Sequence, residues 1–533
     1  MITFIEKVIT VIEAKYVSAL GWIATFASFV IIRNILEGIS SGSGSFLSQK
    51  NFEFFFLHSF TFYLASFLGL ILIINLITKD HIKKTILFVL FLIPIIITPP
   101  LADLAATGGN QTLMTYRQIP PGTNNLIEMS QYFFNYILHG PNGILFFGES
   151  TSLSQVYINY GIRIEIAILI FILLLYTYVK TKSVTKLLWS FLLLQLGLFL
   201  MGHFPYIINL IFGKGSGILS RGDTIMSLLY LFVSTLFAGI IFYLYDKKKT
   251  WSVIKNFRIT RTLNTTILLF IGIILGIKNV DQYVSINWEL IFFILAACLS
   301  NIFCWGWGVS YNDRKDEKID IISNTNRPLP SKTLSLEENN FTSKLFLGLS
   351  YLYGFIVGYA FFVMILIKSS LGYLYSSDFF HLKKYPILSQ FVIACAYLTT
   401  IMAGFLLISG NLISDFPVKL SLSVLVLFTL GVGFKDIKDY QGDKNQNIRT
   451  LPVIFGLERG KKIIGAMGTL AFILIPLIFN QYFYLLIIPS IICAILYFYF
   501  TNKENYKELP VFMTYFSFII FVILLMLTEI IRL

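Results

Sequence analysis

Charged side chains are scarce in this sequence. Only 13% of its 533 residues are Asp, Glu, Lys or Arg, whereas 56% are hydrophobic, and the mean hydropathy is +0.76. A soluble protein of this size needs far more polar surface. Apolar runs long enough to cross a hydrocarbon core of about 30 Å recur along the whole chain. Because these runs are continuous rather than alternating, they exclude a transmembrane β-barrel and predict an all-α polytopic membrane protein.

Cysteine is also scarce, and so is negative charge. The four cysteines show no CxxC or Cys/His spacing, which argues against a disulfide framework and a zinc site. Lys and Arg outnumber Asp and Glu by 41 to 28, giving a net charge of +13. Most of these basic residues lie in short loops between apolar runs, as the positive-inside rule produces, so the charge does not predict nucleic-acid binding. No clear signal-peptide cleavage site follows the first apolar run, which is therefore predicted to be retained.

Six spans are expected before residue 248, near 17–36, 54–77, 84–99, 163–180, 188–212 and 224–245. Lysine clusters follow each even-numbered span, which predicts a cytoplasmic N-terminus and an external polar stretch at about 100–162. The basic stretch at 246–263 then predicts a boundary between two membrane domains. We expect an N-terminal domain of unknown function at 1–248 and a second domain at 249–533.

The second domain shows clear spans near 264–279, 286–310, 387–410, 417–434, 460–478, 481–500 and 509–530. The segment 342–376 fits either one long helix or two short ones joined near Gly354 or Gly358. If the acidic loop at 311–340 and the basic loop at 435–461 face the same side, an even number of spans must separate them. The segment then supplies two helices, the domain has nine spans, and both loops are cytoplasmic.

Two acidic motifs stand at the predicted inner ends of spans in this domain. The first contains Asn312, Asp313, Asp316 and Asp320, and the second contains Asp436, Asp439 and Asp443. Carboxylates three or four residues apart share one face of a helix. Sets of oxygen ligands like these suit Mg²⁺, which prefers a few carboxylates together with phosphate oxygens of a substrate. Two facing motifs at a membrane edge are therefore predicted to hold Mg²⁺ around a diphosphate.

Basic residues are interleaved with both motifs and would neutralise the remaining charge of a diphosphate leaving group. They are Arg327, Lys332, Lys435, Lys438 and Arg449. The diphosphate would stay at the aqueous edge, and a hydrocarbon tail would lie between the helices. That combination describes an isoprenoid diphosphate.

At these motifs the sequence resembles the UbiA superfamily of intramembrane prenyltransferases. The pattern NDxxDxxxD occupies residues 312–320 and is followed by the RPLPS turn, and KDxxDxxGD occupies residues 435–443 and is followed by Thr450-Leu451-Pro452. The resemblance covers about 255–533. The gap before the RPLPS turn is similar to that of the digeranylgeranylglyceryl phosphate synthase and chlorophyll synthase branches.

The resemblance implies nine helices around a cavity that opens to lipid, and transfer of a prenyl group to an aromatic or lipid-like acceptor. It implies Mg²⁺ ligands at Asn312, Asp316, Asp439 and Asp443. It further implies assistance, directly or through water, from Asp313, Asp320 and Asp436, with Lys435 beside them. The residues that it places against the substrates are Arg261, Asn264, Arg327, Tyr375, Lys383 or Lys384, and Arg449.

Two alternatives to a transferase stay open on the sequence. A polytopic transporter could carry acids near the membrane edge, although we find no inverted repeat and the acids cluster at one surface rather than at the midplane. A hydrolase or cyclase could act on the same prenyl diphosphate without an acceptor.

Overall fold

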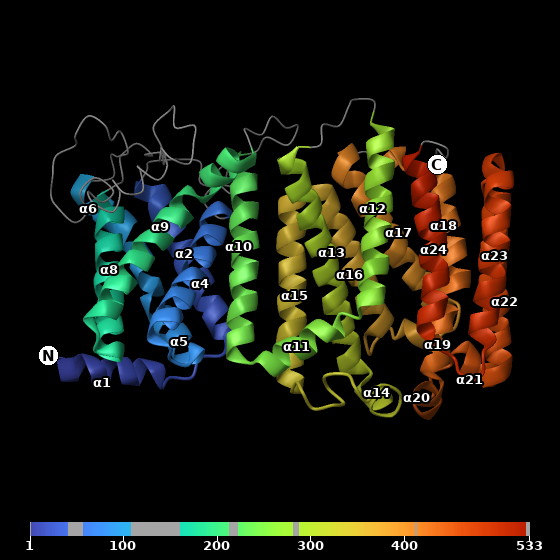
Figure 1. Ribbon diagram of the computed structural model, residues 1–533, viewed down its shortest axis with the longest axis horizontal. Helices are drawn as coiled ribbons and strands as arrows, with labels where there is room; N and C mark the ends of the chain where they lie inside the picture. Colours follow the sequence, from blue (N-terminus) through green and yellow to red (C-terminus); the bar gives the residue numbers. More distant parts are fainter. Residues whose placement is uncertain are drawn as a thin grey trace. The chain divides into compact units, whose positions relative to one another are not determined.

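The computed structural model describes residues 2–40, 57–107, 160–212, 222–280, 287–410 and 413–528. Within these ranges the protein is all-α, and fourteen helices are long and apolar enough to cross a membrane (Figure 1). The prediction of an all-α, multi-pass membrane protein is therefore confirmed. The chain divides into two compact units: Met1–Lys247 with Asn287–Glu289, and Lys248–Ile286 with Leu290–Leu533.

The first unit contains all six predicted spans. Its helices are α1 (Ile2–Glu13), α2 (Ala19–Ser40), α4 (Ser59–Thr78), α5 (Ile82–Leu92) with α6 (Thr98–Thr107), α8 (Tyr160–Thr181), α9 (Val184–Phe212) and α10 (Gly222–Tyr245). The short helix α1 was not predicted. Its Glu13 accepts hydrogen bonds from Tyr176 Oη at 2.8 Å and Lys180 Nζ at 2.6 Å, both on α8. Most of the polar stretch predicted at 100–162 lies outside the described residues.

The second unit contains nine long helices within the described ranges. They are α12 (Ile259–Asn279), α13 (Trp288–Lys315), α15 (Leu336–Val357), α16 (Tyr359–Ser376), α17 (Leu388–Ser409), α18 (Val418–Gly431), α22 (Leu457–Ile478), α23 (Phe483–Asn502) and α24 (Glu508–Leu527). The ambiguous segment at 342–376 is two helices that meet at Gly358. A capping box begins the first of them, because Ser335 Oγ accepts from the Glu338 N–H and the Glu338 carboxylate accepts from the Ser335 N–H.

Helices α12 and α17 pack backbone against backbone. A Cβ atom at Gly272 would lie 1.9 Å from the carbonyl oxygen of Ile401, and one at Gly404 would lie 2.1 Å from the carbonyl oxygen of Leu269. Only glycine permits this approach from both sides. The tight crossing fixes the position of α12, which carries Arg261 toward the polar end of the unit.

Helix α12 also contacts α24, although nearly the whole of the second unit separates them in sequence. An ion pair joins Arg261 to Glu508 near one end of the two helices, and Lys278 donates to the carbonyl oxygen of Met526 near the other. The first and final long helices of this unit are therefore neighbours, and the bundle closes on itself.

Candidate active site

The first acidic motif lies where α13 ends. Asn312 is in the final turn of α13, Asp316 occupies the N-cap position of α14 (Glu317–Ser323) without a side-chain capping bond, and Asp320 follows one turn later. The Asn312 amide donates to the Asp316 carboxylate over 2.7 Å, and Ser376 Oγ donates to Asn312 Oδ1 over 2.8 Å. These bonds fix Asn312 between Asp316 and the end of α16.

The second motif repeats this arrangement. Asp436 lies on α19 (Lys435–Lys438), Asp439 occupies the N-cap position of α20 (Tyr440–Asn445), and Asp443 lies within α20. The two capping acids have nearly the same backbone conformation, with φ −98° and ψ 11° at Asp316 and φ −89° and ψ 4° at Asp439. In each motif the middle acid therefore marks the break between two helices.

The two motifs meet directly. The Asn324 amide donates to Asp320 of the first motif over 3.1 Å and to Asp439 of the second over 3.0 Å. Helix α14 also lies against α20, where the Gly442 N–H donates to Ser323 Oγ over 3.2 Å, and Figure 1 shows both short helices at the same end of this unit. Two segments more than a hundred residues apart thus form one polar cluster.

The glycine of the second motif has a steric role that a substitution can test. A Cβ atom at Gly442 would lie 2.5 Å from Ile319 Cγ2 and 2.6 Å from Ser323 Oγ. We expect Gly442→Ala to force α20 away from α14 and to cost about 1–3 kcal/mol of stability, as overpacking does. A Cβ atom at the helical Gly348 would meet none of the described residues within 4 Å, so Gly348→Ala is the matched control. Equal thermal unfolding midpoints for the two variants would contradict this role.

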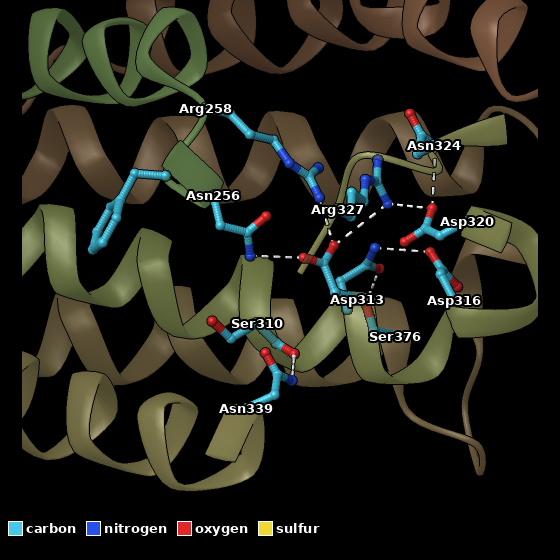
Figure 2. Close-up of polar contacts among 12 residues, drawn as sticks. Asn256, Arg258, Ser310, Asp313, Asp316, Asp320, Asn324, Arg327, Asn339 and Ser376 are labelled. Carbon is cyan, nitrogen blue, oxygen red and sulfur yellow. Dashed lines mark hydrogen bonds and ion pairs between the residues drawn. The ribbon is translucent and has the colours of Figure 1, made fainter. Parts of the chain in front are cut away.

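Asp313 is placed differently from the other motif acids. Its carboxylate is 1% exposed and accepts from the Asn256 amide at 2.8 Å, Arg258 at 2.5 Å and Arg327 at 3.4 Å. Figure 2 shows these donors converging on Asp313. Arg327 also pairs with Asp320, so it links two acids of the first motif. Asp313 therefore anchors the loop that carries Arg327 and the start of α12.

Two lysines reach into the cluster. Lys383, in the turn after α16, is buried and pairs with Asp316. Burial lowers the pKa of Lys383 to about 8, although the nearby Asp443 opposes this shift. Lys435 donates to Tyr375 Oη over 2.6 Å. The neighbouring Lys384 is exposed, so the structure distinguishes between the two lysines that the sequence left as alternatives.

The acids of the cluster are only partly neutralised by these partners. Burial, followed by the Asp436 and Asp439 carboxylates, raises the pKa of Asp443 to about 7. Burial also raises the pKa of Asp320, whose Oδ2 atom is buried without a hydrogen-bond partner among the described residues. Crowded carboxylates with an unpaired oxygen are what a divalent cation would stabilise, so the donor set fits Mg²⁺. In the described ranges, however, no three His, Cys, Asp or Glu side chains are close enough to enclose a metal ion.

The cluster forms the polar end of a cavity of about 250 Å³ in the second unit. Most of the residues that the sequence predicted for the site line this cavity: Arg261, Asn264, Asn312, Asp316, Asp320, Arg327, Tyr375, Lys383, Lys435, Asp436, Asp439 and Asp443. Asp313 and Lys384 are not among the lining residues, and neither is Arg449, which is exposed. The predicted diphosphate contacts of Lys384 and Arg449 therefore have no geometric support.

The cavity also has lining residues that sequence analysis missed. Apolar and aromatic side chains form most of its remaining wall, including Trp305, Trp307, Val392, Ile393, Phe428, Phe434 and Phe512. Lys368 and Arg258 line it as well. No motif marked these positions, because each lies in an ordinary apolar helix or at a helix start. Lys368 is the exception, because a lysine inside an otherwise apolar run is by itself a sign of a functional site.

Comparison with known proteins finds relatives of the part of the chain that carries this cavity. Residues 269–522 match the UbiA prenyltransferase family. A digeranylgeranylglyceryl phosphate synthase of Thermococcus sibiricus is 26% identical over 275 residues, which are 49% of this chain and 95% of that protein. The chloroplastic chlorophyll synthase of Avena sativa is 29% identical over 185 residues, which are 33% of this chain and 48% of that protein.

Solved structures match the same half of the chain. A UbiA homologue from Archaeoglobus fulgidus, determined with GPP and Mg²⁺, has 19% sequence identity and a TM-score of 0.42, covering 52% of this chain and 98% of that one. The family match spans both acidic motifs and begins after Arg261 and Asn264. Residues 269–522 of this chain therefore belong to the UbiA prenyltransferase family, a family of transferases, and the residues before them are not part of that match.

Proposed function

We propose that this protein transfers a prenyl group from an isoprenoid diphosphate to a hydrophobic or aromatic acceptor inside the membrane, with release of diphosphate. One observation carries the proposal: two acidic motifs converge at one end of a cavity whose other walls are largely apolar and aromatic. A diphosphate fits the first environment and a prenyl chain fits the second. The family match favours this enzyme over the transporter alternative.

The polar end would bind and stabilise the diphosphate. Mg²⁺ bound by Asn312, Asp316, Asp439 and Asp443 would supply positive charge to the diphosphate oxygens as they become a leaving group. Lys383, which is paired with Asp316, would hold an ammonium group beside the diphosphate oxygens. Lys435, held by Tyr375, lies in the same wall and adds a second fixed ammonium group.

The apolar walls would protect the reacting carbon from water. The bond between the allylic carbon and the diphosphate oxygen breaks, and the electron pair leaves with the diphosphate. Aromatic faces such as that of Phe428 can stabilise the resulting cation through their π electrons. A nucleophilic atom of the acceptor then forms the new bond to carbon and loses its proton. Exclusion of water prevents simple hydrolysis.

We place this activity in the predicted domain at 249–533 and the two acidic motifs on the cytoplasmic side. Lys315, Lys318 and Lys332 follow the first motif's span, and Lys438, Lys444 and Arg449 surround the second. Such enrichment is typical of cytoplasmic loops. The six-span unit at 1–248 has no assigned role in this reaction.

A transfer assay on the purified full-length protein tests the proposal. In lipid nanodiscs we expect radiolabelled geranylgeranyl diphosphate, Mg²⁺ and a membrane lipid extract to give a labelled lipid and free diphosphate. Removal of divalent cations with EDTA should abolish both products, and added Mg²⁺ should restore them. The mass of the labelled lipid would identify the acceptor.

The alternatives give different results in the same assay. Free diphosphate with only a prenyl alcohol or a cyclised hydrocarbon would replace the proposal with a hydrolase or cyclase. No turnover with donors of several chain lengths, over a range of added acceptors, would overturn it. Variants of Asp316 and Asp439 control for contaminating activity, because both acids line the cavity and are proposed Mg²⁺ ligands.

A further inference from the structure

One lysine of the cavity wall has no role in the reaction as described so far. Lys368 lies on α16 and is 8% exposed. It precedes Tyr375 by seven residues, or about 10 Å along the helix axis, since each residue rises about 1.5 Å. It therefore lines the cavity well away from the diphosphate end, among apolar walls.

The partners of Lys368 are neutral. Its ammonium group donates to Asn301 Oδ1 on α13 over 2.5 Å and lies 3.5 Å from Thr265 Oγ1 on α12. The Asn301 amide in turn donates to Thr265 Oγ1 over 2.8 Å. Three helices thus fix the position of the ammonium group. Among the ion pairs of the described residues, none joins Lys368 to a carboxylate.

A buried ammonium group with only neutral partners is costly, because the lost hydration is not offset by a counter-ion. Other basic side chains of the cavity do have acids: Arg261 has Glu508, Lys383 has Asp316, and Arg327 has Asp313 and Asp320. The ammonium group of Lys368 therefore gains a counter-ion only when an anion enters the cavity. If the Lys368 amine is unprotonated before binding, an acidic ligand transfers its proton to the amine, and the same ion pair results.

We propose that Lys368 binds an anionic oxygen group, a carboxylate or a phosphate, of the acceptor. This inference rests on the proposed prenyl transfer and specifies its acceptor as an acidic molecule. The diphosphate of the donor is held at the opposite, acid-rich end. Lys368 would therefore orient the acceptor, with its nucleophilic atom lying between the anionic group and the allylic carbon.

The test compares matched anionic and neutral probes on the full-length protein in nanodiscs. One pair is a hydroxybenzoate and its methyl ester, and the other is a long-chain alkylglycerol phosphate and its uncharged alkylglycerol. We expect Lys368→Met to lower kcat/KM for the anionic probe that the wild type uses by about 10–100-fold, the range for losing a hydrogen bond to a charged group. The rate with the neutral partner should change less than about 2-fold, and Lys368→Arg should restore part of the loss.

A second readout does not depend on turnover. The anionic probe should raise the thermal unfolding midpoint of the wild type and of Lys344→Met, which replaces a lysine on α15, but not that of Lys368→Met. A response to the hydroxybenzoate would identify the anionic group of the acceptor as a carboxylate, and a response to the alkylglycerol phosphate would identify it as a phosphate. Equal losses on the anionic and neutral probes, weaker donor binding in Lys368→Met, or no binding of either anion to the wild type would overturn the inference. If the wild type binds the anion but transfers no prenyl group, the proposed function fails and the anion site stands.

Discussion

Asp443→Asn is expected to lower Mg²⁺-dependent diphosphate release by on the order of 10³-fold, the scale for losing one strong electrostatic contact to a developing charge. The same substitution should stabilise the metal-free protein. The pKa of Asp443 is raised to about 7 by burial and by neighbouring carboxylates. A carboxyl group whose pKa rises on folding destabilises the folded state wherever it is ionised in the unfolded chain. At pH 8 without divalent cations, the variant should therefore unfold about 2 °C or more above the wild type.

The sign of this effect gives two further checks by thermal unfolding. The stability difference should shrink as the pH falls from about 7 towards the ordinary value of 3.8, because the wild-type carboxyl group is already protonated in the folded state and becomes protonated in the unfolded chain as well. Added Mg²⁺ should stabilise the wild type more than the variant. A variant that is less stable than the wild type at pH 8 without metal, or that keeps full activity, would remove Asp443 from the proposed metal site.

Asp313→Ala is expected to have the largest effect on stability. It would leave Arg258 and Arg327 without the carboxylate that both contact. Breaking a buried charge network from one side typically costs about 3–5 kcal/mol. We expect a lower yield of folded protein and a lower thermal unfolding midpoint, with or without Mg²⁺. The measurement is thermal unfolding of the purified variant in detergent.

The control is Asp378→Ala, which removes an ion pair with Lys315 at a carboxylate that is 76% exposed. Exposed pairs contribute about 0–1 kcal/mol, so this variant should resemble the wild type. If Asp313→Ala instead keeps its stability and loses only Mg²⁺-dependent activity, Asp313 acts on the metal or the substrate and does not stabilise the fold. That result would support the role that the family resemblance implied for it.

The acidic motifs could be predicted because their chemistry is local in sequence. Spacings of three and four residues predicted that the acids gather at a helix end. They do gather there, although the helix breaks at the middle acid of each motif and Asp313 does not line the cavity. The two-helix interpretation of 342–376 is confirmed as to the helices, α15 and α16. It was reached by requiring an even number of spans between two charged loops, and the sides on which those loops lie stay a prediction. Helix α1 was not predicted because it is short. Glu13 joins it to α8 by two hydrogen bonds, and no local sequence pattern indicates such contacts.

The remaining site residues depend on tertiary contacts. Lys383 and Lys384 are adjacent in sequence, and only the turn after α16 decides that the first is buried against Asp316 while the second faces outward. Asn324 lies just beyond the first motif, and its importance comes from reaching Asp439 in the second. For Asp313 the sequence implied assistance to the metal site, directly or through water, and it gave no sign of Arg258, which lies at the start of another helix and donates to Asp313.

The contact between α12 and α24 has a consequence for biosynthesis. Arg261 on α12 and Glu508 on α24 form an ion pair, and both line the cavity. Phe512 and Tyr515 of α24 line it too. A ribosome delivers α12 first and α24 only after every other helix of this bundle, so the wall between them stays open to lipid during most of translation. The nascent chain can therefore acquire both acidic motifs well before it has a closed chamber, and catalytic competence must await the emergence of residues 508–527.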